Sequence, residues 1–133
     1  MGLGKTIQTL SLFQQILNSD SGDHKFLVVC PLSVLKTWML EIGKWTSGLN
    51  PIAYHGSTEE KEKLRRVFRS TVYERVNVVI TSYETLCSDS FFFQKTTWTS
   101  IVLDEGHRIK NYRSKRTQGV YKLRSLFKLV LSG

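Results

Sequence analysis

The residues nearest the start of the chain have the composition of a loop that binds phosphate. Gly4, Lys5 and Thr6 directly follow Gly2 and Leu3, and they lead into a segment with helical spacing. Glycines let backbone N–H groups approach phosphate oxygens, and the start of a helix adds the positive end of its dipole. Lys5 would neutralise the β- and γ-phosphates of ATP, and the Thr6 hydroxyl would be a ligand of Mg²⁺. These five residues therefore predict a nucleotide site, although a Gly-Lys-Thr tripeptide needs a second motif to support it.

A second motif supplies the acidic groups that ATP hydrolysis requires. The apolar run of residues 101–103 ends at Asp104 and Glu105, which Gly106 and His107 follow. Carboxylates that follow a parallel strand point into the crevice where α/β sheets bind ligands. Asp104 would bind Mg²⁺, directly or through water, and Glu105 would orient and deprotonate the water that attacks the γ-phosphate. The alternative is a chance acidic pair after a buried strand, and the phosphate-binding residues upstream weigh against it.

The rest of the chain alternates between short apolar runs and longer segments with helical spacing. The runs rich in Val and Ile predict strands over residues 26–31, 51–55, 76–82, 100–104 and 126–131. Helical spacing predicts helices over residues 6–18, 35–45, 84–94 and 112–126. A further helix is expected to begin at Thr58, which would cap it. This alternation is typical of βαβ units. We therefore expect an α/β fold, with a mostly parallel sheet and helices on both faces, in one domain over residues 1–133.

Several aromatic residues and both cysteines have the positions of core side chains. Large rings at helical or strand-end positions usually fill cores, and free thiols in apolar stretches are usually buried. Neither cysteine has a partner at the spacing of a zinc or redox motif, which suits a reducing compartment. The residues expected to pack in this way are Trp38, Trp45, Trp98, Phe91, Phe92, Phe93, Cys30 and Cys87.

The positive charge of the chain is concentrated near its end. The net charge is +8, and residues 106–133 contain basic side chains but no acidic one. Clustered positive charge attracts polyanions, with nucleic acid as the leading candidate, while a solvated helix face is the alternative. The chain has no apolar run of membrane-spanning length and no signal peptide, so we expect a location inside the cell and no membrane partner. The basic residues are Arg108, Lys110, Arg113, Lys115, Arg116, Lys122, Arg124 and Lys128.

Four segments resemble, in order and spacing, motifs of superfamily 2 helicase-like ATPases of the Swi/Snf-related branch. They are residues 1–9, residues 28–33 together with Trp38, residues 79–84 and residues 103–111. The Asp-Glu-Gly-His box followed by Arg-Ile-Lys-Asn separates this branch from RNA helicases with an Asp-Glu-Ala-Asp box. The resemblance covers essentially the whole chain. It implies the first RecA-like lobe of an ATP-dependent chromatin remodeller, which translocates on duplex DNA, acts on nucleosomes and resides in the nucleus.

The resemblance also implies a DNA interface and residues that couple it to the nucleotide. Without the resemblance, Pro31 would simply end a strand, Thr81 and Ser82 would cap a helix, and Tyr83 would be core. The coupling residues that it implies are His107, Ser132 and Gly133. The DNA-binding residues that it implies are Pro31, Leu32, Ser33, Lys36, Thr81, Ser82, Tyr83, Arg108, Lys110 and Asn111.

Both ends of the chain look cut. A strand is expected before the phosphate-binding residues, and the chain stops directly after an apolar strand. The second RecA-like lobe, which in this family supplies an arginine finger, would lie outside these residues, so we expect them not to hydrolyse ATP alone. Two other functions stay open. One is an RNA or DNA strand-separating helicase with the same lobe, and the other is a catalytically inactive fragment that binds DNA or protein.

Overall fold

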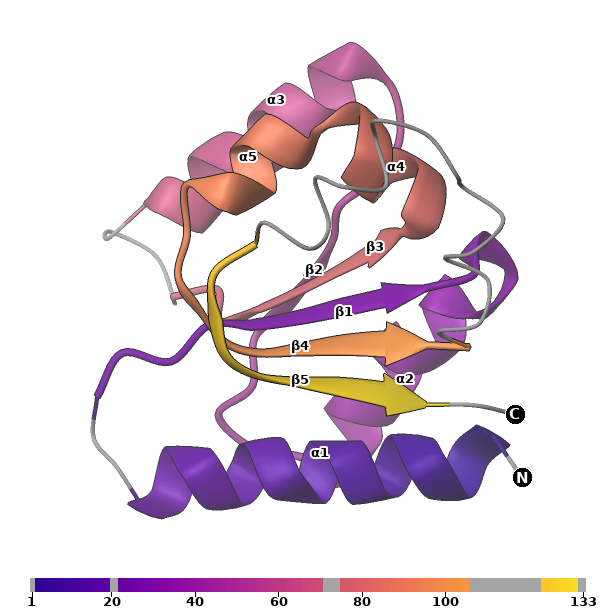
Figure 1. Ribbon diagram of the computed structural model, residues 1–133, viewed down its shortest axis with the longest axis vertical. Helices are drawn as coiled ribbons and strands as arrows, with labels where there is room; N and C mark the ends of the chain where they lie inside the picture. The colour runs from indigo at the N-terminus through magenta and orange to yellow at the C-terminus, as the bar shows by residue number, and fades with distance from the viewer. Residues whose placement is uncertain (1, 20–21, 71–74, 106–122, 132–133) are drawn as a thin grey trace.

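The computed structural model describes residues 2–19, 22–70, 75–105 and 123–131. Helices and strands alternate along the chain, as the apolar pattern predicts (Figure 1). None of the described helices combines the length and the apolar composition needed to cross a lipid bilayer. The elements are α1 (Gly2–Ser19), β1 (Phe26–Cys30), the 3₁₀ helix η1 (Leu32–Val34), α2 (Leu35–Trp45), β2 (Pro51–Ala53), α3 (Thr58–Arg69), β3 (Val78–Ser82), α4 (Tyr83–Ser88), α5 (Ser90–Gln94), β4 (Trp98–Asp104) and β5 (Ser125–Leu131).

The five described strands form one sheet in the order β2-β3-β1-β4-β5, and every neighbouring pair is parallel. β1 lies in the centre, with β3 on one side and β4 on the other. All residues of β1 and β3 are buried, as expected for strands that helices cover on both faces. The parallel arrangement brings all strand ends to one edge of the sheet, which we call the carboxyl edge.

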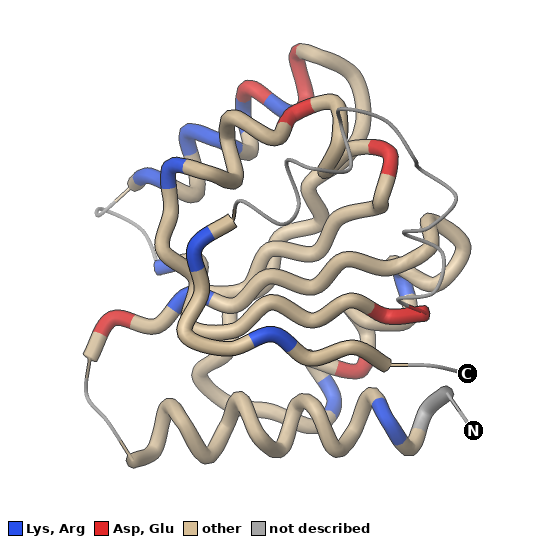
Figure 2. The backbone as a smooth tube through the Cα atoms, in the orientation of Figure 1, with Lys and Arg blue, Asp and Glu red and all other residues tan. Residues whose placement is uncertain are grey.

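Helices cover both faces of the sheet, so the molecule has three layers (Figure 1). α1 and α2 pack on one face, where Phe13 stacks on Phe26 with ring centroids 4.2 Å apart. α3, α4 and α5 lie against the other face, where Phe93 and Trp98 are fully buried. Charged residues are prominent on α3 and in the connections, whereas the middle strands are almost free of them (Figure 2). The α/β fold with helices on both faces is therefore confirmed.

Some expectations from the sequence are wrong in detail. α1 begins at Gly2 instead of Thr6, and the cap of α3 is Ser57 instead of Thr58. Ser57 forms a reciprocal capping box with Glu60, which satisfies N–H groups at the helix start. The expected helix over 84–94 consists of two helices, α4 and α5, that meet at Asp89. The expected helix over 112–126 lies mostly outside the described residues, and Ser125 already belongs to β5.

Two of the aromatic residues expected in the core lie at the surface. Trp45 is 52% exposed at the end of α2, where its indole N–H donates to Glu41 one turn earlier. Phe91 is 71% exposed, because α5 turns only Phe92 and Phe93 toward the sheet. Three consecutive residues of a helix point in different directions, so they cannot all face one layer. Trp38, Trp98 and Cys30 are buried as expected, and Cys87 is partly buried.

Phe93 is buried and Phe91 is exposed on the same helix, so substituting each with alanine should lower the free energy of unfolding by different amounts. Phe93→Ala removes a ring from the core and should lower the free energy of unfolding by about 3–5 kcal/mol. Phe91→Ala is the matched control on the same helix and should change it by about 0.5 kcal/mol or less. Denaturant unfolding of the two variants checks this, and equal losses would contradict the packing described here.

Candidate active site

Polar residues from three strands meet at the carboxyl edge of the sheet. Cys30 at the end of β1 is aligned with Ser82 at the end of β3. On the other side of β1, Val29 is aligned with Leu103, so Asp104 follows at the level of Cys30. The central strands of the sheet therefore place a hydroxyl, a thiol and a carboxylate next to one another in a row. This is the place where open parallel sheets bind their ligands.

Asp104 is held by two aromatic residues from separate elements. The indole Nε1 of Trp38, on α2, donates a hydrogen bond of 2.9 Å to Oδ2 of Asp104. The hydroxyl of Tyr83, the first residue of α4, donates to the backbone carbonyl of Asp104 at 2.7 Å. Trp38 is 1% exposed and Tyr83 is 3% exposed, so both donors approach Asp104 from the interior. The carboxylate itself is partly exposed and is thus fixed in direction while remaining open to a ligand.

Glu105 has an unusual backbone conformation directly after β4. Its φ is 52°, and it is the one non-glycine residue with positive φ among those the structure describes. A side chain in this left-handed region costs roughly 1–2 kcal/mol, and such residues cluster at functional sites. The conformation turns the chain away from the strand direction immediately after Asp104. The acidic motif thus spans the end of β4 and the first residue of the turn that follows it.

The pKa of the Cys30 thiol is affected by burial and by the charge of Asp104 at this edge. Burial raises the pKa of the Cys30 thiol to about 12, and the nearby negative charge of Asp104 contributes to the rise. The side chain is fully buried on the face covered by α1 and α2. Cys30 is therefore a protonated structural thiol beside the carboxylate. A thiol with so high a pKa is neither a nucleophile nor a ready metal ligand at neutral pH.

The phosphate-binding residues expected at the start of the chain are helical. Gly2 to Thr6 form the first turns of α1, so the expectation of a loop ahead of the helix is wrong, whereas phosphate binding by these residues stays a prediction. The helix begins at the carboxyl edge, on the side of the sheet where the strands end (Figure 1). Lys5 is partly exposed and its carbonyl accepts a 2.9 Å hydrogen bond from Thr9, while Thr6 is buried. The first N–H groups of a helix lack partners within it and can bind anions.

These residues fit Mg²⁺ and a nucleotide in part. From the described residues, the Asp104 carboxylate accepts one side-chain hydrogen bond, at Oδ2, which leaves Oδ1 as a ligand atom. No group of three His, Cys, Asp or Glu side chains gathers in the described part of the chain. Mg²⁺ at nucleotide sites needs only one or two carboxylates in addition to phosphates. The carboxyl edge thus fits the metal, whereas the helical start of α1 offers N–H groups but no surrounding loop for the phosphates.

The first predicted DNA-binding segment lies largely at the surface of the carboxyl edge. Leu32 is 54% exposed, and Ser33 and Lys36 are exposed as well. Pro31 is buried and ends β1, and its carbonyl accepts the N–H of Val34 to form η1. Three of the four residues are therefore accessible to a large partner. Pro31 has the structural position that its residue type alone would suggest.

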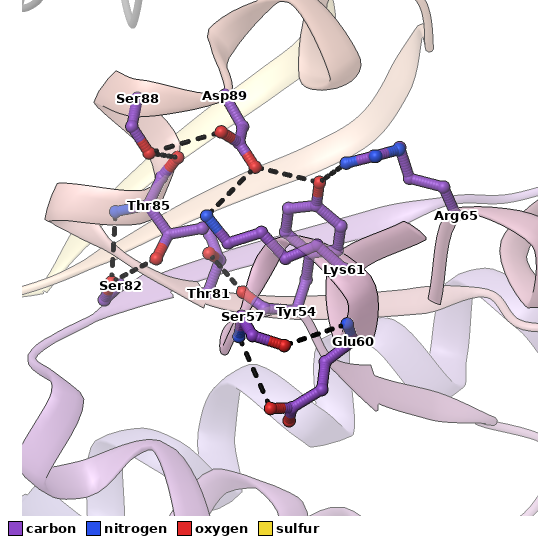
Figure 3. Close-up of polar contacts among 10 residues, drawn as sticks. All are labelled: Tyr54, Ser57, Glu60, Lys61, Arg65, Thr81, Ser82, Thr85, Ser88 and Asp89. Carbon is purple, nitrogen blue, oxygen red and sulfur yellow. Dashed lines mark hydrogen bonds and ion pairs between the residues drawn. The ribbon is translucent and has the colours of Figure 1, made fainter. Parts of the chain in front are cut away.

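The second predicted DNA-binding segment is engaged inside the protein, as Figure 3 shows for Thr81 and Ser82. Thr81 is fully buried, and its hydroxyl donates to the carbonyl of Tyr54 at 2.8 Å. Ser82 caps α4 by accepting the N–H of Thr85, and it also donates to the hydroxyl of Thr85. Tyr83 is core. All three side chains are therefore buried and hydrogen-bonded within the fold in this conformation. That this segment contacts DNA stays a prediction.

The remaining predicted site residues lie outside the described part of the chain. They include the predicted coupling residues and the predicted DNA-binding residues that follow the acidic box. The residues are His107, Arg108, Lys110, Asn111, Ser132 and Gly133.

Two polar arrangements were not predicted from the sequence. The first is the hydrogen bond from Trp38 to Asp104, since the sequence pattern indicates only packing for Trp38. A buried indole N–H usually needs an acceptor, and this requirement could have predicted the bond. The second arrangement is a network on the opposite face, in which the Tyr54 hydroxyl contacts Arg65 and Asp89, and Asp89 pairs with Lys61 at 3.3 Å (Figure 3). Burial raises the pKa of Tyr54. This network joins α3 to the junction of α4 and α5, and no sequence motif marked it.

The fold and the acidic strand end define a class of protein. A parallel sheet with helices on both faces and an Asp-Glu pair at the end of a central strand is the architecture of a RecA-like ATPase lobe. The chain belongs to the SNF2-related domain family, whose family model matches residues 1–133. The Swi/Snf-related resemblance of the sequence is thereby confirmed.

Similar proteins agree with this assignment. The chain is 40% identical over 135 residues to the ATP-dependent DNA helicase DDM1 of Arabidopsis thaliana, covering 100% of this chain and 18% of that protein. It is 38% identical over 118 residues to the ATP-dependent helicase brm of Drosophila melanogaster, covering 89% of this chain and 7% of that protein. The chain therefore spans a small part of the length of these relatives. Both are named as ATP-dependent enzymes.

A solved structure has the same fold. It is the Sulfolobus solfataricus SWI2/SNF2 ATPase core in complex with dsDNA, with a TM-score of 0.78 and 31% sequence identity. The match covers 100% of this chain and 26% of that one. The RecA-like fold is thus confirmed across the described elements.

The raised pKa of Cys30 predicts how stability depends on pH. Between 9.0 and about 12 the unfolded thiol ionises while the folded thiol stays protonated, so the folded state binds more protons. Stability should therefore fall as pH rises through this window, and one group contributes at most about 1.4 kcal/mol per pH unit. Urea unfolding across this alkaline range checks the slope. Cys30→Ala should show a shallower fall than the unchanged protein, and equal slopes would contradict the assignment.

Proposed function

We propose that these residues form part of the motor of an ATP-dependent translocase that moves on duplex DNA and repositions nucleosomes. In this proposal they belong to the first RecA-like lobe, and the natural protein that contains them supplies the second lobe. The protein acts in the nucleus. The proposal concerns the natural protein, and residues 1–133 alone are not expected to turn over ATP, because an arginine finger on a partner lobe is worth roughly 10³–10⁵ in rate.

One observation carries the proposal. Asp104 and Glu105 end a buried central strand in a fold whose solved relative is a SWI2/SNF2 ATPase core in complex with dsDNA. Family membership over the full chain adds support, as do relatives named as ATP-dependent enzymes. A relative named as a subunit of the SWI/SNF chromatin-remodeling complex, from Schizosaccharomyces pombe, is 35% identical over 134 residues and favours nucleosomes as the substrate.

In this proposal, different residues at the carboxyl edge bind the metal, bind the phosphates and accept the proton during hydrolysis. Asp104 and the Thr6 hydroxyl would hold Mg²⁺, and Lys5 with the N–H groups at the start of α1 would bind the phosphates. Mg²⁺, when bound, neutralises charge on the phosphate oxygens. Glu105 would accept the proton of the attacking water. Binding of the phosphates would require the first turn of α1 to open or to present its N–H groups directly.

DNA would contact the exposed segment that follows β1. Leu32, Ser33 and Lys36 present a backbone turn, a hydroxyl and an ammonium group at the surface, and these groups suit phosphate contacts that carry no sequence information. Arg108, Lys110 and Asn111 would extend this interface. Translocation requires contacts that are independent of sequence, so a backbone-directed surface is the kind that a motor needs.

ATP hydrolysis by the natural protein tests the proposal. We expect hydrolysis to be stimulated by duplex DNA or nucleosomes and to exceed that with RNA or with no polymer. Glu105→Gln should lower the stimulated rate by at least about 100-fold, since a general base contributes roughly 10²–10⁴. Glu62→Gln, which changes an exposed carboxylate on α3, is the matched control and should retain the rate.

Other outcomes would favour the other functions. Stimulation by RNA alone, with displacement of a strand, would identify a strand-separating helicase. No hydrolysis under any of these conditions, in a protein that still binds DNA, would identify an inactive binding module.

A further inference from the structure

We propose that Trp38 and Tyr83 are positioning residues that clamp Asp104 from opposite faces of the sheet and link its metal-binding carboxylate to the two segments that follow β1 and β3. The inference rests on the proposed function, because it concerns the same site. It adds two residues that act through Asp104 and do not themselves touch the nucleotide.

The first part of the clamp is the indole of Trp38. Its N–H can only donate, and it donates 2.9 Å to one oxygen of the carboxylate. At 1% exposure the indole is shielded from water, and a hydrogen bond to an ionised group is stronger than one between neutral groups. The bond holds Oδ2 and leaves Oδ1 to act as the metal ligand. Partners that orient a metal-binding carboxylate in this way tune its affinity for the metal.

The second part of the clamp is the hydroxyl of Tyr83. It donates 2.7 Å to the backbone carbonyl of Asp104, so it fixes the strand end and not the carboxylate. Trp38 belongs to the core beneath α1 and α2, whereas Tyr83 belongs to the core beneath α4 and α5. Asp104 is consequently held from both layers of helices. A shift of either layer relative to the sheet would displace it.

Trp38 and Tyr83 each lie in, or next to, a segment that we propose to contact DNA. η1 runs directly into α2, so the exposed Leu32 and Ser33 lie in the same continuous segment as Trp38. Tyr83 directly follows Ser82, the last residue of β3 and the cap of α4. A polymer that presses on η1 would therefore move the start of α2 and with it the indole. The carboxylate would then be oriented differently with and without DNA.

The inference is tested with Trp38→Phe and Tyr83→Phe, which remove the two hydrogen-bond donors, and the protein contains a matched control for each. Trp45 lies on the same helix as Trp38, and its indole N–H also donates to a carboxylate, but that carboxylate is Glu41 on the surface of α2. Tyr54 is a buried tyrosine whose hydroxyl bonds to Arg65 and Asp89 instead of to the carboxyl edge. Trp45→Phe and Tyr54→Phe remove the same polar groups as Trp38→Phe and Tyr83→Phe, at positions where these groups bond to residues other than Asp104.

Metal binding by the natural protein tests the inference without relying on catalysis. Mn²⁺ is titrated as a spectroscopic substitute for Mg²⁺, with a non-hydrolysable ATP analogue present, and free Mn²⁺ is followed by electron paramagnetic resonance. Trp38→Phe should weaken Mn²⁺ binding roughly 10–100-fold, and Tyr83→Phe should weaken it about 10-fold, as expected for partners that orient a ligand. Trp45→Phe and Tyr54→Phe should leave it unchanged. Duplex DNA should tighten Mn²⁺ binding in the unchanged protein and do so less in Trp38→Phe.

The outcomes separate this inference from the proposed function. Unchanged Mn²⁺ binding in Trp38→Phe and Tyr83→Phe, in a protein with DNA-stimulated hydrolysis, overturns the inference alone. Losses of equal size in the two control variants also overturn it, because they indicate general destabilisation. If Trp38→Phe does not fold, Tyr83→Phe, which removes a single oxygen, decides the question. An unchanged protein that neither binds Mn²⁺ with the analogue nor hydrolyses ATP overturns the proposed function and the inference together.

Discussion

The parallel pairing of β1 with both β3 and β4 is the constraint on which the rest of the structure depends. It aligns Cys30 with Ser82 and places Asp104 beside them, although these residues are far apart in the sequence. Parallel strands cannot be joined by short turns, so the chain must return along a face of the sheet between them, usually through a helix. The same constraint therefore explains why helices cover both faces and why the chemical groups gather at one edge.

The two helical layers differ in what they contribute to that edge. The α1/α2 layer brings the start of α1 and the indole of Trp38, while the α3/α4/α5 layer brings the hydroxyl of Tyr83. Asp104 is the residue on which both layers converge. The polar network of Tyr54, Arg65 and Asp89 lies on the side of the second layer and joins α3 to the junction of α4 and α5, apart from the bonds to Asp104.

The sequence predicted the fold well, because Val- and Ile-rich runs and helical spacing determine which elements form. The acidic strand end was also found, since Asp104 and Glu105 follow a continuous apolar run. Side-chain direction was harder to predict. Phe91 and Phe93 differ by two positions, and only the packing of α5 decides which of them is buried. Thr81, Ser82 and Tyr83 match a DNA-binding motif, yet their hydroxyls satisfy internal groups. The bond from Trp38 to Asp104 joins two elements that no local pattern connects.

A structure of the natural protein with Mg²⁺, a non-hydrolysable ATP analogue and duplex DNA tests the central claim most directly. The account predicts Mg²⁺ at the carboxyl edge, about 2.0–2.1 Å from Asp104 or one water away, with the phosphates at the start of α1 and Trp38 still bonded to the carboxylate. A nucleotide bound on another surface, with Asp104 bonded only within the protein, would contradict it.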